Sequence, residues 1–257
     1  MCASKSARLS ISSSRRVMTP AILSVGGMDG RARRAVTVNA RWHDGRVAET
    51  DYVEWHASYD DPNSGLSWRL GMVQGYLRRA FGDQKGPIRI LSVCSGDGRD
   101  VLGVLAGRAD GDRFAVTLLE VHPQLAQSAR DAAKAAGLAN IEVRTVDAGT
   151  SDAYVGAVPA DVVLLVGIFG NISVDDIWRT IAAAPQLCRT GATLIWSRSR
   201  DRDDLNNEIR AAFAEAGFTE LDYAALERES RPALGVMRYD GEAVELGFLG
   251  RLFTFRR

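Results

Sequence analysis

The sequence has 257 residues, of which 46% are hydrophobic and 25% are charged. This length and mixture suit one α/β domain with an N-terminal extension rather than two full domains. Lys+Arg and Asp+Glu are both 32, so the formal net charge is +0. Because neither sign dominates, the composition argues against general electrostatic binding of nucleic acid or of a cationic partner.

Cysteine and histidine are both scarce, with three of each in the chain. The odd cysteine count and the absence of a CxxC spacing exclude a disulfide framework, and so few ligands make a zinc site unexpected. No apolar run approaches the roughly 18 residues needed to span a bilayer. We therefore expect a reduced, cytoplasmic protein with neither a metal site nor a membrane span.

The N-terminal region differs in composition from the remainder. Its first forty residues are rich in serine and hold seven basic side chains against a single acid, Asp29. We expect residues 1–40 to form a disordered tail, or else translation to begin at Met18 or Met28 rather than at Met1. Residues 41–86 are expected to form a helical cap segment, and residues 87–257 the ligand-binding domain.

Two features are predicted within the cap segment. Five apolar residues recur at helical spacing, so a helix is predicted over residues 64–81. The stretch before it, residues 52–63, is aromatic and acidic. It is expected to pack on the domain as a cover over the site.

From about residue 87 the chain alternates short apolar runs with amphipathic patterns. Strands are predicted over residues 88–94, 115–120, 141–145, 161–166, 193–197 and 218–223. Helices are predicted around residues 101–105 and over residues 123–137, 173–187 and 205–216, the third opened by a capping box at Ser173. In the tail, residues 235–239 and 251–255 are expected to be strands joined by turns. The alternation is typical of an α/β domain with a mostly parallel sheet and helices on both faces.

Gly96 and Gly98 stand directly between a predicted strand and a predicted helix. Without a Cβ the backbone turns tightly and comes close to a ligand. The free N–H groups at the start of the helix suit an anionic group. A packing requirement would explain the same two glycines, so this turn alone does not identify a site.

Two acids strengthen the case for a ligand. Glu120 ends the next predicted strand, 24 residues after Gly96, where a carboxylate can accept hydrogen bonds from both hydroxyls of a ribose. Asp147 follows the third strand, where an adenine amino group is expected. The simpler interpretations are a helix cap for Glu120 and a solvated turn residue for Asp147. Together, and in this order, the features favour an adenosine-containing ligand.

These residues resemble the motifs of class I S-adenosylmethionine-dependent methyltransferases. Residues 90–99, Ile-Leu-Ser-Val-Cys-Ser-Gly-Asp-Gly-Arg, are similar to the first motif. Glu120 is similar to the second, Asp147 with Ala148 to the third, and residues 161–171 to the fourth. The resemblance implies a Rossmann-like, mostly parallel seven-stranded sheet with an antiparallel C-terminal strand. It also implies S-adenosyl-L-methionine as cofactor and methyl transfer as activity.

The cofactor site that follows from this resemblance is drawn from the cover segment and from the carboxyl ends of the strands. It comprises Tyr59, Ser95, Gly96, Asp97, Gly98, Asp100, Glu120, Val121, His122, Asp147, Ala148, Gly167 and Phe169. Several have a plainer interpretation: His122 starts a helix, and Phe169 is a core aromatic.

Two positions depart from the family pattern. Ser92 replaces an acid that in the family helps to hold the amino group of the methionine moiety, and Cys94 replaces the first glycine. We hypothesise that Asp97, Asp100 or a carboxylate of segment 59–61 takes over from the missing acid. Cys94 is interpreted as a small packing residue rather than as a nucleophile.

Methyl transfer to a hydroxyl or a protonated amine requires a general base. His56 is the first candidate because its pKa is naturally near the working range, although it can also serve as a hydrogen-bonding partner beside Trp55. Asp60, Asp61 and His43 follow as further candidates.

The acceptor pocket is expected beyond the fourth and fifth strands. Asn171 is the second catalytic candidate, because a loop amide at the carboxyl end of a strand faces the ligand crevice of an open α/β sheet. Ser197 and Arg198 are expected to line the same pocket. Arg198 suits an anionic acceptor, although a solvated charged loop is the alternative.

The sequence is also compatible with other functions. A nicotinamide-binding oxidoreductase would use Glu120 equally well, but Val101 stands where its third glycine is needed. A protein that binds S-adenosylmethionine without methylating is a further alternative. A nucleic-acid methyltransferase is disfavoured, because residues 167–171 read Gly-Ile-Phe-Gly-Asn instead of an Asn-Pro-Pro-Tyr type motif. The sequence favours a small-molecule acceptor and leaves the oligomeric state open.

Overall fold

The computed structural model describes residues 59, 61–201, 203–227, 230–247 and 250–256. The predictions for residues 1–58 and for Asp60 lie outside these described residues. They include the N-terminal tail, His43, His56 and most of the cover segment.

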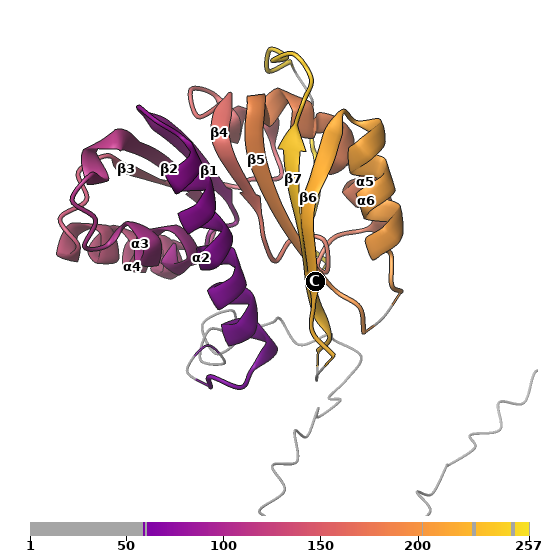
Figure 1. Cartoon of the computed structure of the whole chain (residues 1–257), viewed down its shortest axis with the longest axis horizontal. Helices are drawn as coiled ribbons and strands as arrows, with labels where there is room; N and C mark the ends of the chain where they lie inside the picture. Colours follow the sequence, from indigo (N-terminus) through magenta and orange to yellow (C-terminus); the bar gives the residue numbers. More distant parts are fainter. Residues whose placement is uncertain (1–58, 60, 202, 228–229, 248–249, 257) are drawn as a thin grey trace, which may run out of the picture. The chain divides into compact units, whose positions relative to one another are not determined.

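The described part of the chain is built around a seven-stranded sheet in the order β3-β2-β1-β4-β5-β7-β6 (Figure 1). Its strands are β1 (Ile88–Val93), β2 (Phe114–Glu120), β3 (Ile141–Thr145), β4 (Ala160–Leu165), β5 (Cys188–Ser199), β6 (Phe218–Ala225) and β7 (Pro232–Tyr239). The first five strands pair in parallel, and β7 is antiparallel to both of its neighbours, β5 and β6. The predicted mostly parallel sheet with an antiparallel C-terminal strand is confirmed.

Helices cover both faces of the sheet, as predicted. One group comprises α2 (Gly65–Asp83), α3 (Arg99–Leu105) and α4 (Pro123–Ala135), and the other comprises α5 (Val174–Ala183) and α6 (Asn206–Glu215). Figure 1 shows the two groups on opposite sides of the strands. Among the described helices, none is long and apolar enough to cross a membrane.

The central strands are apolar on both sides because they are covered on both sides. Ile90 of β1 and Leu164 of β4 pack with α2, α3 and α4 in one core cluster. Their neighbours Leu91 and Val163 pack with α5 and α6 in the other. All four side chains are fully buried, and each contributes about 2 kcal/mol by leaving water.

The helix predicted over residues 173–187 is shorter in the structure. The regular helix α5 ends at Ala183, and a 3-10 helix (Ala184–Leu187) follows. Pro185 explains the break, because it lacks the N–H needed to continue the α-helical hydrogen bonds. At the other end, Ser173 Oγ accepts from the Asp176 backbone N–H at 3.1 Å. In a full capping box the side chain of the third residue after the cap would accept from the Ser173 N–H. Here the Asp176 carboxylate instead pairs with Arg179 and accepts from the Thr254 N–H.

The prediction of a strand over residues 251–255 is wrong. This segment makes one isolated antiparallel bridge, between Arg251 and Thr150, and joins no strand of the sheet. The physical reason is that β7 already pairs on both edges, with β5 and with β6. Leu252 and Phe253 instead bury their side chains in the α5–α6 core cluster, where each is 1% exposed.

A polar contact ties helix α2 to the edge strand β6. Tyr76 is a buried residue, and its hydroxyl donates to the half-exposed Asp222 carboxylate at 3.0 Å. Burial, together with this carboxylate, raises the pKa of Tyr76 to about 12. The folded protein therefore holds the phenolic proton more tightly than the unfolded chain does.

We expect Tyr76→Phe to lower the free energy of unfolding by about 1 kcal/mol at pH 8. Below pH 10 the tyrosine is protonated in both states, so its contribution is complete there. Between pH 10 and about 12 only the unfolded state ionises, so the contribution is lost as the pH rises. Urea unfolding of wild type and Tyr76→Phe at pH 8 and pH 11 should therefore show a smaller difference at pH 11. A difference that grows with pH would contradict this assignment.

Candidate active site

The predicted glycine turn lies at the carboxyl end of β1 and leads into α3. Three of its residues have positive φ: Cys94 at 53°, Gly96 at 59° and Gly98 at 73°. The Ser95 N–H donates to Leu119 O at 2.9 Å, which ties the turn to β2. Ser95 Oγ is buried without a hydrogen-bond partner among the described residues. The turn is thus fixed in place and still holds an unused polar atom.

Glu120 connects this turn to the end of β2. Its side chain is buried, one carboxylate oxygen accepts from Gly96 N–H at 2.8 Å, and the other accepts from His122 N–H at 2.8 Å. His122 is the N-cap residue of α4, so Glu120 supports the start of that helix as well as the turn. Each carboxylate oxygen has room for a second hydrogen bond. The helix-supporting role and a ligand-binding role are therefore compatible.

The two residues after Glu120 have surfaces that suit a bound ring. Val121 is an apolar side chain with 62% of its surface exposed. His122 Nδ1 is buried and has no hydrogen-bond partner among the described residues. An apolar exposed face next to an unused polar atom is a surface that a flat heteroaromatic group can cover.

Asp147 follows β3 and is half exposed. One of its oxygens accepts from Gly149 N–H at 2.8 Å, and the other forms an ion pair with Arg251 at 2.9 Å. Ala148 is buried, and its carbonyl accepts from the Tyr154 hydroxyl at 2.7 Å. The loop after β3 is therefore fixed by a hydrogen bond within the loop, by Tyr154 and by Arg251.

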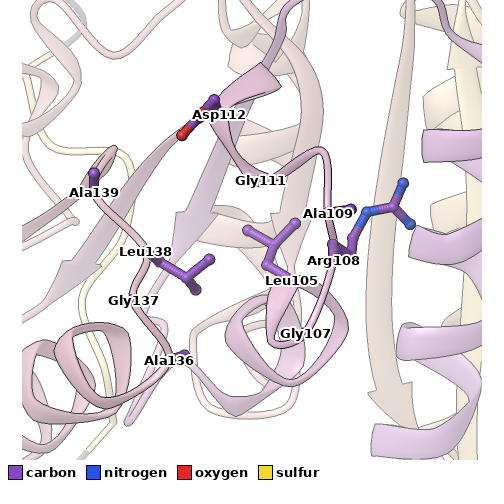
Figure 2. Close-up of a pocket in the computed structure, with 10 residues that line it drawn as sticks. All are labelled: Leu105, Gly107, Arg108, Ala109, Gly111, Asp112, Ala136, Gly137, Leu138 and Ala139. Atoms are coloured by element: carbon purple, nitrogen blue, oxygen red, sulfur yellow. The ribbon is translucent and has the colours of Figure 1, made fainter.

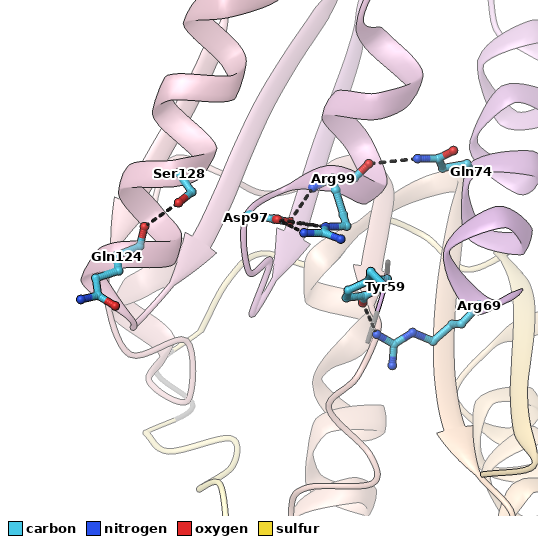
Figure 3. A network of polar contacts seen from close by, with 7 residues as sticks. All are labelled: Tyr59, Arg69, Gln74, Asp97, Arg99, Gln124 and Ser128. Carbon is cyan, nitrogen blue, oxygen red and sulfur yellow. Dashed lines mark hydrogen bonds and ion pairs between the residues drawn. The ribbon is translucent and has the colours of Figure 1, made fainter. Parts of the chain in front are cut away.

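Tyr59 lies over the start of α3, held by two arginines (Figure 3). The Arg99 guanidinium stands 4.3 Å from the centre of the Tyr59 ring, and Arg69 of α2 donates to the Tyr59 hydroxyl at 2.6 Å. Burial raises the pKa of Tyr59, an effect that Arg69 opposes and the charge of Asp100 reinforces. The Asp97 carboxylate accepts hydrogen bonds from the backbone N–H of Arg99 and from two N–H groups of its guanidinium. Predicted site residues from the cover segment and from the turn are thus brought together.

The loop after β4 forms the neighbouring part of the site. Gly167 N–H donates to Ser197 Oγ at 2.9 Å, and the exposed Asn171 donates through Nδ2 to Gly167 O at 2.8 Å. Phe169 is fully buried, and its ring lies 6.1 Å from that of Trp196. Its ring therefore belongs to the core, which was the plainer interpretation of this residue.

No protein-family model matches the sequence, and comparison with curated proteins finds no significant match. Solved structures do match. Magnesium protoporphyrin IX methyltransferase from Synechocystis PCC 6803, with bound SAM, superimposes with a TM-score of 0.59 at 13% identity, over 75% of this chain and 92% of that one. The fold is that of class I S-adenosylmethionine-dependent methyltransferases.

Two further methyltransferases share this fold. An O-methyltransferase family protein from Burkholderia thailandensis matches with a TM-score of 0.56 and 15% identity, over 76% of this chain and 62% of that one. The carbon methyltransferase CurJ matches with a TM-score of 0.54 and 13% identity, over 73% and 58% of the two chains. This chain thus spans less than two thirds of each. At these identities the likeness concerns the fold alone.

Cys94, which replaces the first glycine of the family motif, is unusual in both its backbone conformation and its surroundings. Cys94 adopts the left-handed backbone region, which costs a non-glycine residue about 1 kcal/mol or more. Burial, followed by the nearby charges of Glu120 and Asp147, raises the pKa of the Cys94 thiol. The sulfur is therefore held as a neutral thiol, which is the opposite of what an activated nucleophile requires.

A C-terminal strap, residues 250–256, crosses the same edge of the methyltransferase fold. Leu252 N–H donates to Gly149 O at 2.7 Å, in the loop after β3. Arg256 N–H donates to Asn171 O at 2.7 Å, in the loop after β4. The strap thus joins the two loops that carry Asp147 and Asn171. The local apolar pattern of this segment predicted a strand and gave no sign of these contacts, because its partners lie far away in the chain.

A pocket in the structure lies at the opposite edge of the sheet (Figure 2). It is formed where α3 and α4 end and β2 begins, between residues such as Leu105, Asp112 and Leu138. None of the predicted site residues lines it. A second pocket runs from Asp97 and Arg99 along α3 and α4 to Ala136, and so begins at the glycine turn.

Proposed function

We propose that this protein is a methyltransferase that uses S-adenosyl-L-methionine and acts on an oxygen or nitrogen atom of a small-molecule acceptor. The observation that carries the proposal is the buried Glu120 carboxylate. It ends β2, orders the glycine turn through Gly96 N–H, and retains acceptor capacity for the two hydroxyls of a ribose. The fold of the solved methyltransferases supports this assignment.

The residues present suit the proposed cofactor. Glu120 would hold the ribose, Val121 and His122 would contact the adenine, and Asp147 with Ala148 would contact its polar edge. The buried Ser95 Oγ, which has no partner among the described residues, is a polar atom available to the ligand.

The amino-acid end of the cofactor has to be bound without the acid that the methyltransferase family has at the position of Ser92. Ser92 is buried and neutral. Asp97 and Asp100, at the start of α3 beside Tyr59, are therefore proposed to take the amino group. Because Asp97 already receives Arg99, this arrangement holds charges of both signs, as a zwitterionic amino acid requires.

The bound cofactor supplies a methyl group on a positively charged sulfur, which is ready for in-line displacement. The chain then has to place the acceptor atom, exclude water and remove a proton. Asn171, exposed and fixed to Gly167 O, is proposed to orient the acceptor. His56 is proposed to take the proton as the acceptor's lone pair forms the new bond to carbon.

Three alternatives are distinguished by experiment. The first alternative is a nicotinamide-dependent oxidoreductase, whose fingerprint motif has its third glycine at the position of Val101. In this structure the Val101 side chain is fully buried. A protein that binds the cofactor without transferring methyl groups would use the same Glu120. A nucleic-acid methyltransferase would use the same cofactor and differ in the acceptor.

The test is calorimetric titration of the full chain with S-adenosylmethionine and with NAD, followed by transfer of a radiolabelled methyl group. Saturable binding of S-adenosylmethionine alone is expected, and NAD binding in its place would overturn the proposal. Label is then expected in the small-molecule fraction of a cell extract. Label in the RNA or DNA fraction identifies a nucleic-acid enzyme. Binding with no label in any fraction identifies the non-methylating alternative.

A further inference from the structure

Arg198 occupies an unusual position at the carboxyl end of β5. Its Nη1 donates to Phe169 O at 2.7 Å and its Nη2 donates to Asp203 O at 2.8 Å, so two backbone carbonyls fix the plane of the guanidinium. Its Nε is buried without a hydrogen-bond partner among the described residues. Within the described ranges, Arg198 forms no ion pair with a carboxylate. The guanidinium of Arg198 is charged at all relevant pH values. It is therefore a fixed positive charge that no described carboxylate contacts directly.

A second positive charge lies close to it. Arg256, in the C-terminal strap, is exposed and is anchored through its backbone N–H to Asn171 O. Burial lowers the pKa of Arg198. The charge of Asp203 opposes this, the charge of Arg256 lowers the pKa further, and the charge of Asp204 has a smaller opposing effect. The Arg256 side chain makes no ion pair with any described carboxylate.

Three other arginines, one directly after β5, one directly before β7 and one on α6, are paired. Arg200 forms an ion pair with Glu227 at 2.7 Å, and Arg231 contacts the same carboxylate at 3.4 Å. Arg210 of α6 pairs with Glu220 at 2.6 Å. The combination of two neighbouring cations without an ion-pair partner therefore distinguishes Arg198 and Arg256 from these three.

We propose that Arg198 and Arg256 form an anion-binding subsite, and that the methyl acceptor carries a carboxylate or phosphate group bound there. The subsite adjoins the loop of Phe169 and Asn171, at the carboxyl edge of the sheet where ligands of open α/β folds bind. An oxyanion accepts charge-assisted hydrogen bonds from guanidinium groups and relieves the repulsion between the two arginines. The acceptor role rests on the proposed function, whereas anion binding does not.

The experiment is calorimetric titration of the full chain with inorganic phosphate and, separately, with benzoate, at constant ionic strength. Each titration is done with and without S-adenosylhomocysteine. One anion is expected to bind per chain, and the tighter of the two probes identifies the phosphate or the carboxylate class. Arg256→Gln and Arg198→Gln are each expected to weaken binding at least tenfold, because each removes one charge-assisted partner.

Arg238→Gln is the matched control. Arg238 is an exposed arginine of β7 that pairs with Asp240 and lies opposite Thr193, toward the other end of β5, so anion binding should change less than twofold. Arg256→Gln removes no side-chain hydrogen bond between described residues, which makes it informative even if Arg198→Gln does not fold. Absence of saturable binding, or equal binding by all variants, would overturn the inference. If S-adenosylmethionine still binds in that case, the proposed function stands, so the two failures are distinguishable.

Discussion

Replacing Glu120 by glutamine is expected to weaken S-adenosylmethionine binding about 100-fold, which corresponds to about 2.7 kcal/mol. The carboxylate already accepts one backbone N–H on each oxygen, from Gly96 and from His122. Glutamine keeps the shape but offers a single acceptor oxygen, and its amide N–H₂ group then opposes one of these two N–H groups. The remaining acceptor capacity is too small for both ribose hydroxyls.

The matched control for this prediction is Glu142→Gln. Glu142 lies on the neighbouring strand β3 and pairs with Arg144 at 2.8 Å, with 57% of its side chain exposed. It carries the same charge outside the proposed site, so calorimetry should show unchanged cofactor affinity. Thermal unfolding of both variants separates lost binding from lost folding. A folded Glu120→Gln protein with wild-type affinity would remove Glu120 from the site.

Gly98→Ala is expected to destabilise the fold by about 3 kcal/mol. Gly98 has φ of 73°, where an alanine is strained. An added Cβ would also lie 2.8 Å from Leu118 Cδ1 and 3.0 Å from Leu102 Cδ1. Both leucines are buried against α3 and the sheet, so neither can move aside without disturbing the core.

The control for Gly98 is Gly137→Ala, at the turn after α4. Gly137 has φ of 68°, and the described residues leave open space within 4 Å of an added Cβ. It therefore isolates the backbone strain, about 1 kcal/mol. Urea unfolding followed by circular dichroism measures both variants. If both variants lose the same free energy of unfolding, the contact of the added Cβ with Leu102 and Leu118 does not contribute to the destabilisation.

The strands and most helices follow from patterns within a few residues. Residues 141–145 are predicted and observed with the same bounds, and β1 differs from its prediction by one residue. Local patterns gave the wrong result for residues 251–255, whose apolar side chains satisfy a strand pattern but pack in the α5–α6 core cluster without joining the sheet. The helical apolar periodicity that begins at Ser173 continues past Ala183, but the α-helix ends there because Pro185 lacks a backbone N–H.

The parallel sheet, the glycine turn and the acids at the carboxyl ends of β2 and β3 could all be predicted from local sequence. Hydrophobic periodicity and chain order are local properties, and in a parallel sheet they place all carboxyl ends at one edge. Two other features appear only in the folded chain: Asp147 pairs with Arg251, 104 residues away, and Arg198 and Arg256 bind the same loop at Phe169 O and Asn171 O. Such contacts depend on how distant segments pack on a finished core, and no spacing between neighbouring residues encodes them.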